Sequence, residues 1–204
     1  MRNPLLRTRR QAVRAAVAAL ALGGVLLLPS RAGAAEMTAD VPEKEGPVVF
    51  DPASGSHFQL ILPDHSFRGF TWEDAQARAH RRSRAGVPGR LAKVTTRETF
   101  QFLRRALPAR EPFWIGLRYW CRFRTLQWDD GTLLERGGFQ AWHPQWFRDP
   151  ATTCETATHM KFMPVYMTAA QEGGLWQAAG DVKFMRGFVV EYPARPTDTA
   201  PRDP

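Results

Sequence analysis

The stretch Phe113-Trp114-Ile115-Gly116-Leu117 decides the fold. Four large apolar side chains surround a single glycine, and a short apolar run of this kind predicts a buried strand. A glycine inside a strand is typical of a place where another backbone comes close. We therefore expect this strand to lie in the core, with the two large side chains beside Gly116 buried and a second segment of chain packed against the glycine.

Two helices are predicted before this strand. The first begins at Thr71, which has capping-box spacing to Asp74, and its apolar side chains recur at helical spacing at Trp72, Ala75 and Ala79. The second has the same cap spacing at Thr95 and Glu98. Its apolar stripe is formed by Thr99, Phe102, Leu103, Ala106 and Leu107, and Pro108 ends it.

The other predicted strands are short and lie mostly in the second half of the chain. They cover Phe58–Leu62, Phe123–Trp128, a segment near residues 160–166, and Gly187–Tyr192, with a tight turn at Asp129-Asp130-Gly131. The long stretch 142–174 has three prolines and weak periodicity, so we expect mainly loops there. Early helices followed by late strands predict an α+β fold, with helices packed on small antiparallel sheets, instead of alternating βαβ units.

The first 34 residues are typical of a secretory signal peptide, with an arginine-rich start, an apolar run and small residues at Ala32 and Ala34. An uncleaved membrane anchor is the alternative, although a run of about 15 apolar residues is short for a membrane span. We expect export to the periplasm or outside the cell. Either the general or the twin-arginine route fits, because Arg9 and Arg10 only loosely match the twin-arginine motif.

Removal of residues 1–34 changes the electrostatic character of the chain. The whole sequence carries 28 basic and 20 acidic residues, for a net charge of +8, but six arginines lie in the leader. The remaining 22 basic residues leave a net charge of +2, so the high isoelectric point is no argument for a nucleic-acid partner. We expect a flexible segment at 35–47, one folded domain at 48–193 and a disordered, proline-rich tail at 194–204.

The chain has two cysteines, Cys121 and Cys154. In an oxidising compartment two cysteines in an exported chain usually pair, which predicts a disulfide; two buried free thiols are the alternative. No zinc-type histidine spacing and no nucleophile motif is present, so we expect no enzyme and no metal centre. The basic run His80–Arg84 is consistent with a solvated helix end or with binding of an anionic polymer.

Six blocks of sequence, in order and at the right spacing over residues 56–193, resemble the C-type lectin-like domain. They are Trp72–Ala75, Gly89–Val94 with Glu98 and Phe102, Trp114–Leu117, Trp128–Gly131, Phe139–Trp142, and Trp176 with the closing strand Gly187–Tyr192. The resemblance implies the lectin-like fold. It also implies a ligand-binding module, with carbohydrate as the expected ligand.

Calcium-dependent members of this family hold the ion with oxygen-bearing side chains that this chain largely lacks. The resemblance places Asp149 and Ala151 in the calcium loop, and Gln177 and Ala178 after Trp176. Alanine has no side-chain oxygen, and Glu155 and Asp181 are off the family's spacing, so we expect the calcium site to be lost. The family also links its first helix to its last strand by a disulfide. The resemblance places residues such as Ala79 and Val190, which are not cysteines, at those two positions. Cys154 matches a loop cysteine of the family, but Cys121 is not its usual partner.

The family resemblance implies that the ligand binds in the loop region 143–176. The candidate ligand-binding side chains are aromatic or polar: Trp142, His143, Gln145, Trp146, Asp149, Glu155 and Trp176, with Phe147 and Tyr166 as further aromatic candidates. The aromatic members are equally consistent with loop packing in the core, because large apolar side chains are usually buried. Two functions remain open: recognition of a glycan, and a protein-interaction or structural domain of the cell envelope.

Overall fold

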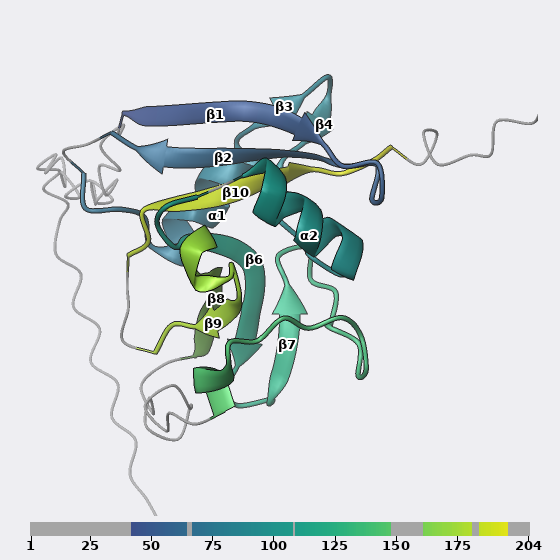
Figure 1. Ribbon diagram of the computed structural model, residues 1–204, viewed down its shortest axis with the longest axis vertical. Helices are drawn as coiled ribbons and strands as arrows, with labels where there is room; N and C mark the ends of the chain where they lie inside the picture. The colour runs from purple at the N-terminus through teal and green to yellow at the C-terminus, as the bar shows by residue number, and fades with distance from the viewer. Residues whose placement is uncertain (1–41, 65–66, 108, 148–160, 181–183, 196–204) are drawn as a thin grey trace, which may run out of the picture. The chain divides into compact units, whose positions relative to one another are not determined.

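The computed structural model describes residues 42–64, 67–107, 109–147, 161–180 and 184–195, all of which belong to the unit Ala39–Pro204 (Figure 1). The predicted leader 1–34 and the tail beyond residue 195 lie outside the described residues. Within the described part, no helix is long and apolar enough to cross a membrane.

One mixed sheet organises the domain. Its strands, in spatial order, are β1 (Glu43–Phe50), β2 (His57–Pro63), β10 (Gly187–Tyr192), β6 (Phe113–Trp120), β8 (Phe162–Met167) and β9 (Trp176–Ala178). Two further strands join it, β5 (Arg90–Leu91) on β10 and β7 (Thr125–Trp128) on β6. Within the sheet only β10 and β6 run parallel. The α+β fold class is confirmed.

The predicted flexible segment 35–47 is wrong at its C-terminal end, because β1 begins at Glu43. Its residues pair with β2 from Glu43 opposite Pro63 to Phe50 opposite His57, with one irregularity between Glu45 and Val48. The acidic residues gave no apolar alternation from which a strand could be predicted. They instead make ion pairs across to α1 and the residues after it, Glu43 with Arg78 and Arg82, and Glu45 with Arg82.

The first helix, α1 (Trp72–His80), is as predicted. The Thr71 side chain accepts from the Asp74 backbone N–H, the Asp74 carboxylate accepts from the Thr71 backbone N–H, and Trp72, Ala75 and Ala79 are buried. The hydrophobic stripe therefore faces the sheet, as helical periodicity requires.

The N-cap of the second helix, α2 (Arg97–Ala106), lies one residue later than the predicted cap at Thr95. Thr96 is the N-cap: its hydroxyl oxygen accepts from the Thr99 backbone N–H at 3.1 Å. The buried face also differs from the predicted stripe, since Phe100 is buried while Phe102 is only half-buried. The sequence analysis assigned the cap to Thr95, whereas the structure places it at the adjacent Thr96.

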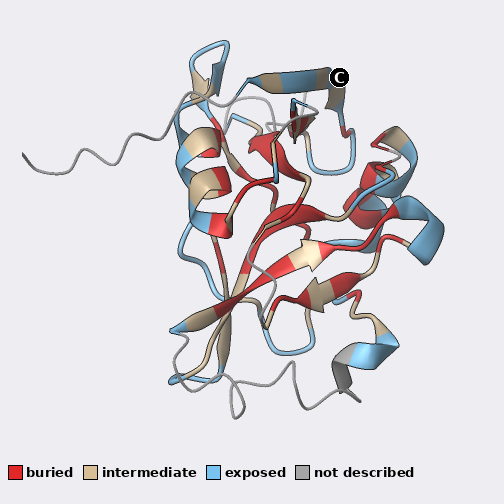
Figure 2. Cartoon of the chain, turned by 90° about the vertical axis from the view of Figure 1, so that its left-hand side faces the viewer, coloured by how far each residue is buried: buried red, intermediate tan, exposed pale blue. Residues whose placement is uncertain are grey.

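The core is divided by the sheet into two clusters of buried side chains, and Figure 2 shows buried residues along the central strands. Successive residues of β6 alternate between them, with Ile115 and Leu117 on the α2 side and Trp114 on the α1 side. A Cβ atom on Gly116 would lie 2.8 Å from the Leu91 carbonyl oxygen. The glycine therefore permits the close backbone approach that the sequence predicts.

The adjacent threonines before α2 give a direct test of the cap. We expect Thr96→Ala to lower the free energy of unfolding by about 1 kcal/mol, because it removes the side-chain acceptor of an N-terminal N–H group. Its matched control is Thr95→Ala, which removes an exposed side chain and leaves the Thr96 cap in place. Thermal unfolding measures both, with Tm falling by roughly 2–4 °C in the first variant only. An equal loss in both variants would contradict the observed helix start.

Candidate functional site

The described part of the predicted ligand-binding region contains Trp142, His143 and Gln145. Trp142 is half-buried and packs edge-on against Trp176, with ring centroids 5.7 Å apart. The His143 backbone N–H donates to the Trp176 carbonyl oxygen at 2.7 Å, and the exposed Gln145 donates its backbone N–H to His143 Nδ1. These three residues lie together at the edge of the sheet next to β9, with polar atoms of His143 and Gln145 toward solvent.

The prediction is wrong for Trp176, whose side chain is 0% exposed. Its ring makes edge-to-face contacts with Trp128, Phe139 and Trp142 at 5.7 to 5.9 Å. A side chain enclosed in this way has no face left for a ligand. Trp176 is therefore part of the hydrophobic core, and the half-buried Trp142 packs against its ring.

The rest of the predicted set is not described by the structure. Asp149, Glu155 and Cys154 lie outside the described residues, and so does Asp181. Trp146 and Phe147 belong to a short 3-10 helix, Pro144–Phe147, but only their backbone is described. The assignment of Trp146, Asp149 and Glu155 to ligand binding stays a prediction.

Aromatic and polar side chains line the α1 side of the neighbouring strands β6, β7, β8 and β9. We call this set the aromatic–arginine face: Arg118, Trp120, Gln127, Phe162, Tyr166 and Gln177. The sheet register creates this face. Trp120 lies opposite Phe162 on β8, and Arg118 lies opposite Gln127 on β7. Because side chains alternate along a strand, Arg118 and Trp120 point to the same side as the buried Trp114.

The Arg118 guanidinium lies over three aromatic rings. Its central carbon is 4.8 Å from the Trp120 ring centroid, 5.1 Å from that of Trp72 and 5.5 Å from that of Phe162. A cation within about 6 Å of a ring face is attracted by the ring quadrupole. Gln127 fixes the arrangement, because its side-chain oxygen accepts from Trp120 Nε1 at 2.7 Å and from Arg118 Nη2 at 3.3 Å. The rings and the cation therefore form one pre-organised surface.

Burial lowers the pKa of Arg118, while the nearby Asp129 and Glu73 oppose this shift. The guanidinium keeps its charge at neutral pH, since an arginine titrates far above it. Among the described residues its Nη1 has no hydrogen-bond partner, and Arg118, Trp120 and Phe162 are all half-buried. The face thus presents a charged donor beside apolar rings, which is the composition of a site that holds a polar ligand with apolar faces.

The other end of this face is formed by Tyr166 and Gln177. The Tyr166 hydroxyl donates to the Gln177 side-chain oxygen at 2.8 Å, and burial raises the pKa of Tyr166. The next residue, Ala178, is buried. Among the described residues, no group of three or more His, Cys, Asp or Glu side chains could hold a metal ion.

The family model of the lectin C-type domain matches residues 68–168, from the start of α1 through β8. This chain contains a C-type lectin domain. The match agrees with the resemblance found in the sequence blocks, and it makes a ligand-binding module the expected role of the domain. No curated protein matches the sequence.

The C-type lectin domain is also similar to solved structures. The carbohydrate-recognition domain of the mouse scavenger receptor C-type lectin is 19% identical with a TM-score of 0.48, covering 68% of this chain and 92% of that one. The cow CD23 carbohydrate-recognition domain, solved in the presence of a GlcNAc2Man3 oligosaccharide, is 20% identical with a TM-score of 0.47, covering 69% and 89%. The lectin CEL-I from Cucumaria echinata is 17% identical with a TM-score of 0.45, covering 67% and 89%.

Sequence reasoning missed the core of the aromatic–arginine face, Arg118, Trp120 and Phe162. One signal was present. Counting by two from Trp114 passes through Gly116 to Arg118 and Trp120, which predicts one shared face along β6. The pattern was hidden because an arginine on that face breaks the apolar run, and because Phe162 reaches the face only through long-range pairing.

Cys121, at the end of β6, is disulfide-bonded, and the other cysteine of the chain lies outside the described residues. We predict a Cys121–Cys154 disulfide. Mass spectrometry of unreduced tryptic peptides should detect the linked pair, and reduction should lower the free energy of unfolding by about 3 kcal/mol because it releases a loop of over thirty residues. The matched control is the Cys121→Ser/Cys154→Ser double variant, whose stability should not respond to reductant. Two freely alkylated cysteines would refute the pairing.

Proposed function

We propose that this chain is an exported binding module that recognises carbohydrate without calcium. The ligand would lie on the aromatic–arginine face. Trp142 packs against Trp176, which belongs to the cluster on the other side of the sheet, so Trp142, His143 and Gln145 stay a separate prediction. The observation that carries the proposal is the half-buried pair of rings, Trp120 and Phe162, held together under the Arg118 guanidinium. The family of the domain supports a binding module and not an enzyme.

A saccharide has apolar C–H faces and a rim of hydroxyl groups. Rings at the surface supply rigid apolar area for the C–H faces, and they lose little conformational entropy on binding because their positions are fixed beforehand. The Trp120 and Phe162 ring centroids are 5.3 Å apart. Arg118 Nη1 can donate to a hydroxyl or carboxylate oxygen at the rim, and hydrogen bonds to a charged donor are stronger than neutral ones.

Calcium independence is supported by the side chains of β9. Gln177 stands at a family ligand position, but its oxygen already accepts from the Tyr166 hydroxyl. Ala178, at the other position, has no side-chain oxygen and is buried. A calcium ion needs six to eight oxygen ligands, many of them carboxylate. The described residues of β9 do not fit the family's calcium centre, so calcium takes no part in the proposed recognition.

A glycan array probed with and without EDTA tests the proposed recognition. We expect binding to survive EDTA and Trp120→Ala to weaken it by about fivefold, since a ring contact is worth on the order of 1 kcal/mol. The matched control is Phe123→Ala, which removes an aromatic side chain that is 65% exposed on the same β6–β7 hairpin. That variant should bind as the parent does. Unchanged binding by Trp120→Ala would contradict the assignment of the face.

A second candidate is a protein-interaction domain without a sugar site. It is favoured by the large apolar side chains that the described residues leave exposed, among them Phe123 at 65% and Leu133 at 58%. Exposed apolar area of this kind, when contiguous, is typical of protein interfaces. The same array separates the two functions: no bound glycan with or without EDTA, together with loss of a protein partner in Phe123→Ala, would support the second candidate.

The calcium proposal has its own thermodynamic test. A cation that binds only the folded state raises stability by RT ln(1 + [L]/Kd), and ~1 kcal/mol shifts Tm of a domain this size by roughly 2–4 °C. We expect Tm in millimolar calcium to equal Tm in EDTA. A calcium-dependent rise in Tm that Asp149→Ala abolishes would contradict the proposal, because it would identify a working calcium loop.

A further inference from the structure

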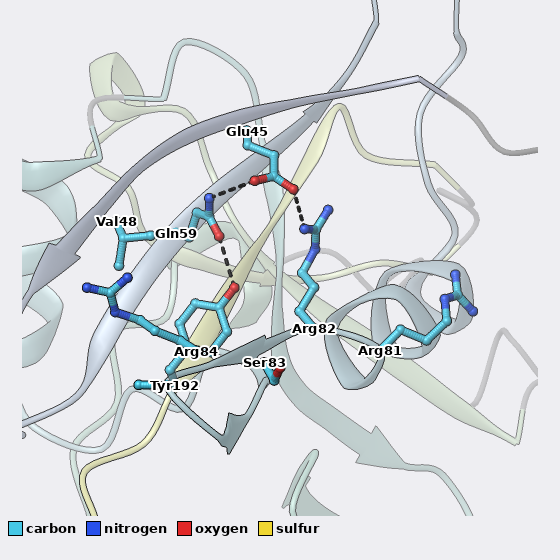
Figure 3. A pocket seen from close by; sticks show the side chains of 9 residues that line it. Glu45, Val48, Gln59, Arg81, Arg82, Ser83, Arg84 and Tyr192 are labelled. Carbon is cyan, nitrogen blue, oxygen red and sulfur yellow. Dashed lines mark hydrogen bonds and ion pairs between the residues drawn. The ribbon is translucent and has the colours of Figure 1, made fainter.

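A pocket of about 590 Å³ lies between β1, β2 and the small hairpin formed by β3 (Ser83–Arg84) and β4 (Val87–Pro88) (Figure 3). Its volume is within the range of about 300–1,000 Å³ that small-molecule sites occupy. The walls are polar: Gln59 lies between Glu45 and Tyr192, and Arg84 and Arg82 lie on either side of Tyr192. None of these residues belongs to the aromatic–arginine face.

The charges around this pocket do not balance. Glu43 and Glu45 are paired with Arg78 and Arg82, so two carboxylates neutralise two guanidinium groups. Arg84 also lines the pocket, and among the described residues it has no ion pair. Figure 3 shows Arg84 beside Val48 and Tyr192, whereas Arg81 points away from them. An uncompensated cation at a polar pocket predicts a negatively charged ligand.

The backbone holds Arg84 in this position. The two residues that follow it both have positive φ, 48° at Ala85 and 81° at Gly86, as the two central residues of a type I′ hairpin turn do. A non-glycine residue in this region costs on the order of 1 kcal/mol. The turn ties β3 to β4, with Ser83 opposite Pro88 and Arg84 opposite Val87. The guanidinium therefore extends from a fixed hairpin and not from a free loop.

The opposite wall is equally fixed. The Tyr192 hydroxyl donates to the Gln59 side-chain oxygen at 2.9 Å, and Gln59 Nε2 donates to Glu45 and to the Gly46 carbonyl oxygen. Burial raises the pKa of Tyr192, and the positive charges of Arg82 and Arg84 oppose that shift, which agrees with their position near the hydroxyl. The wall formed by Glu45, Gln59 and Tyr192 is thus in place before a ligand arrives, and the exposed Arg84 side chain extends beside it.

We propose that this pocket binds an anionic group, a carboxylate, sulfate or phosphate, through the Arg84 guanidinium. A guanidinium presents N–H donors in a planar fork that matches the oxygens of these anions, so one arginine can make two hydrogen bonds to one ligand group. Of the two interpretations of the basic run His80–Arg84, anion binding is the one that this pocket supports. The site is separate from the proposed carbohydrate surface, and either can fail without the other.

The test is an NMR titration of the backbone amides of residues 83–86 with four probes: inorganic sulfate, inorganic phosphate, an oligomer of a uronic acid and a neutral oligosaccharide of equal length. We expect saturable shifts with at least one anionic probe and none with the neutral one. Saturation by the inorganic ions would identify a free anion as the ligand, and saturation by the uronate oligomer alone would identify an acidic saccharide. Affinity should fall with added salt, because the contact is electrostatic.

Arg84→Gln should weaken binding of the saturating probe about tenfold, and Arg84→Lys should recover part of the loss because it restores the charge without the fork. The matched control is Arg136→Gln, which makes the same charge change at an exposed arginine in the loop after β7. It should leave the affinity unchanged. Absence of a saturable shift with all anionic probes, or equal weakening in the Arg84→Gln and Arg136→Gln variants, would overturn the proposal.

Discussion

Two reciprocal hydrogen bonds between buried indoles and backbone carbonyls hold this domain together. Trp72 Nε1 donates to the Ile115 carbonyl oxygen at 2.9 Å, and Trp114 Nε1 donates to the Phe70 carbonyl oxygen at 2.7 Å. Both indoles are fully buried. Each ring fills the core while its polar atom satisfies a backbone acceptor of the other segment, so the start of α1 cannot move relative to β6 without leaving buried polar groups unpaired.

These two hydrogen bonds help to fix α1 on the sheet. In the family that this chain resembles, a disulfide between the first helix and the last strand does so. Ala79 and Val190 stand at those positions, and both are fully buried in the cluster that also contains Trp72 and Trp114. Gly89 lies between them, because a Cβ atom there would be 2.7 Å from the Ala79 carbonyl oxygen and 2.9 Å from Val190 Cγ1. Close packing replaces the covalent link. Arg118 and Trp120, on the proposed ligand surface, lie further along β6 than this contact.

The sequence predicted the framework well and the binding surfaces poorly, for a physical reason. Strong local signals, the Thr71–Asp74 cap and the Trp114–Leu117 run, depend on neighbours in the chain, and the structure confirms both. The start of β1 was missed because an edge strand rich in Glu and Lys has no apolar alternation. Trp176 was misassigned because a tryptophan in a loop region is equally consistent with a ligand contact and with core. The aromatic–arginine face and the pocket beside Arg84 both bring together residues that are far apart in the chain, so no local pattern of the sequence predicts them.

The central claim is that a rigid tryptophan framework carries a separate ligand surface, and the indole N–H resonances of the seven tryptophans test it most directly. Hydrogen exchange should be slow at Trp72 and Trp114, whose N–H groups are fully buried and hydrogen-bonded to the backbone, and faster at Trp120, which is only half-buried and bonded to the Gln127 side chain. On addition of a bound saccharide the Trp120 resonance should shift, while those of Trp72 and Trp114 stay in place. Fast exchange at Trp72 and Trp114, or ligand-induced shifts at them with none at Trp120, would contradict the account.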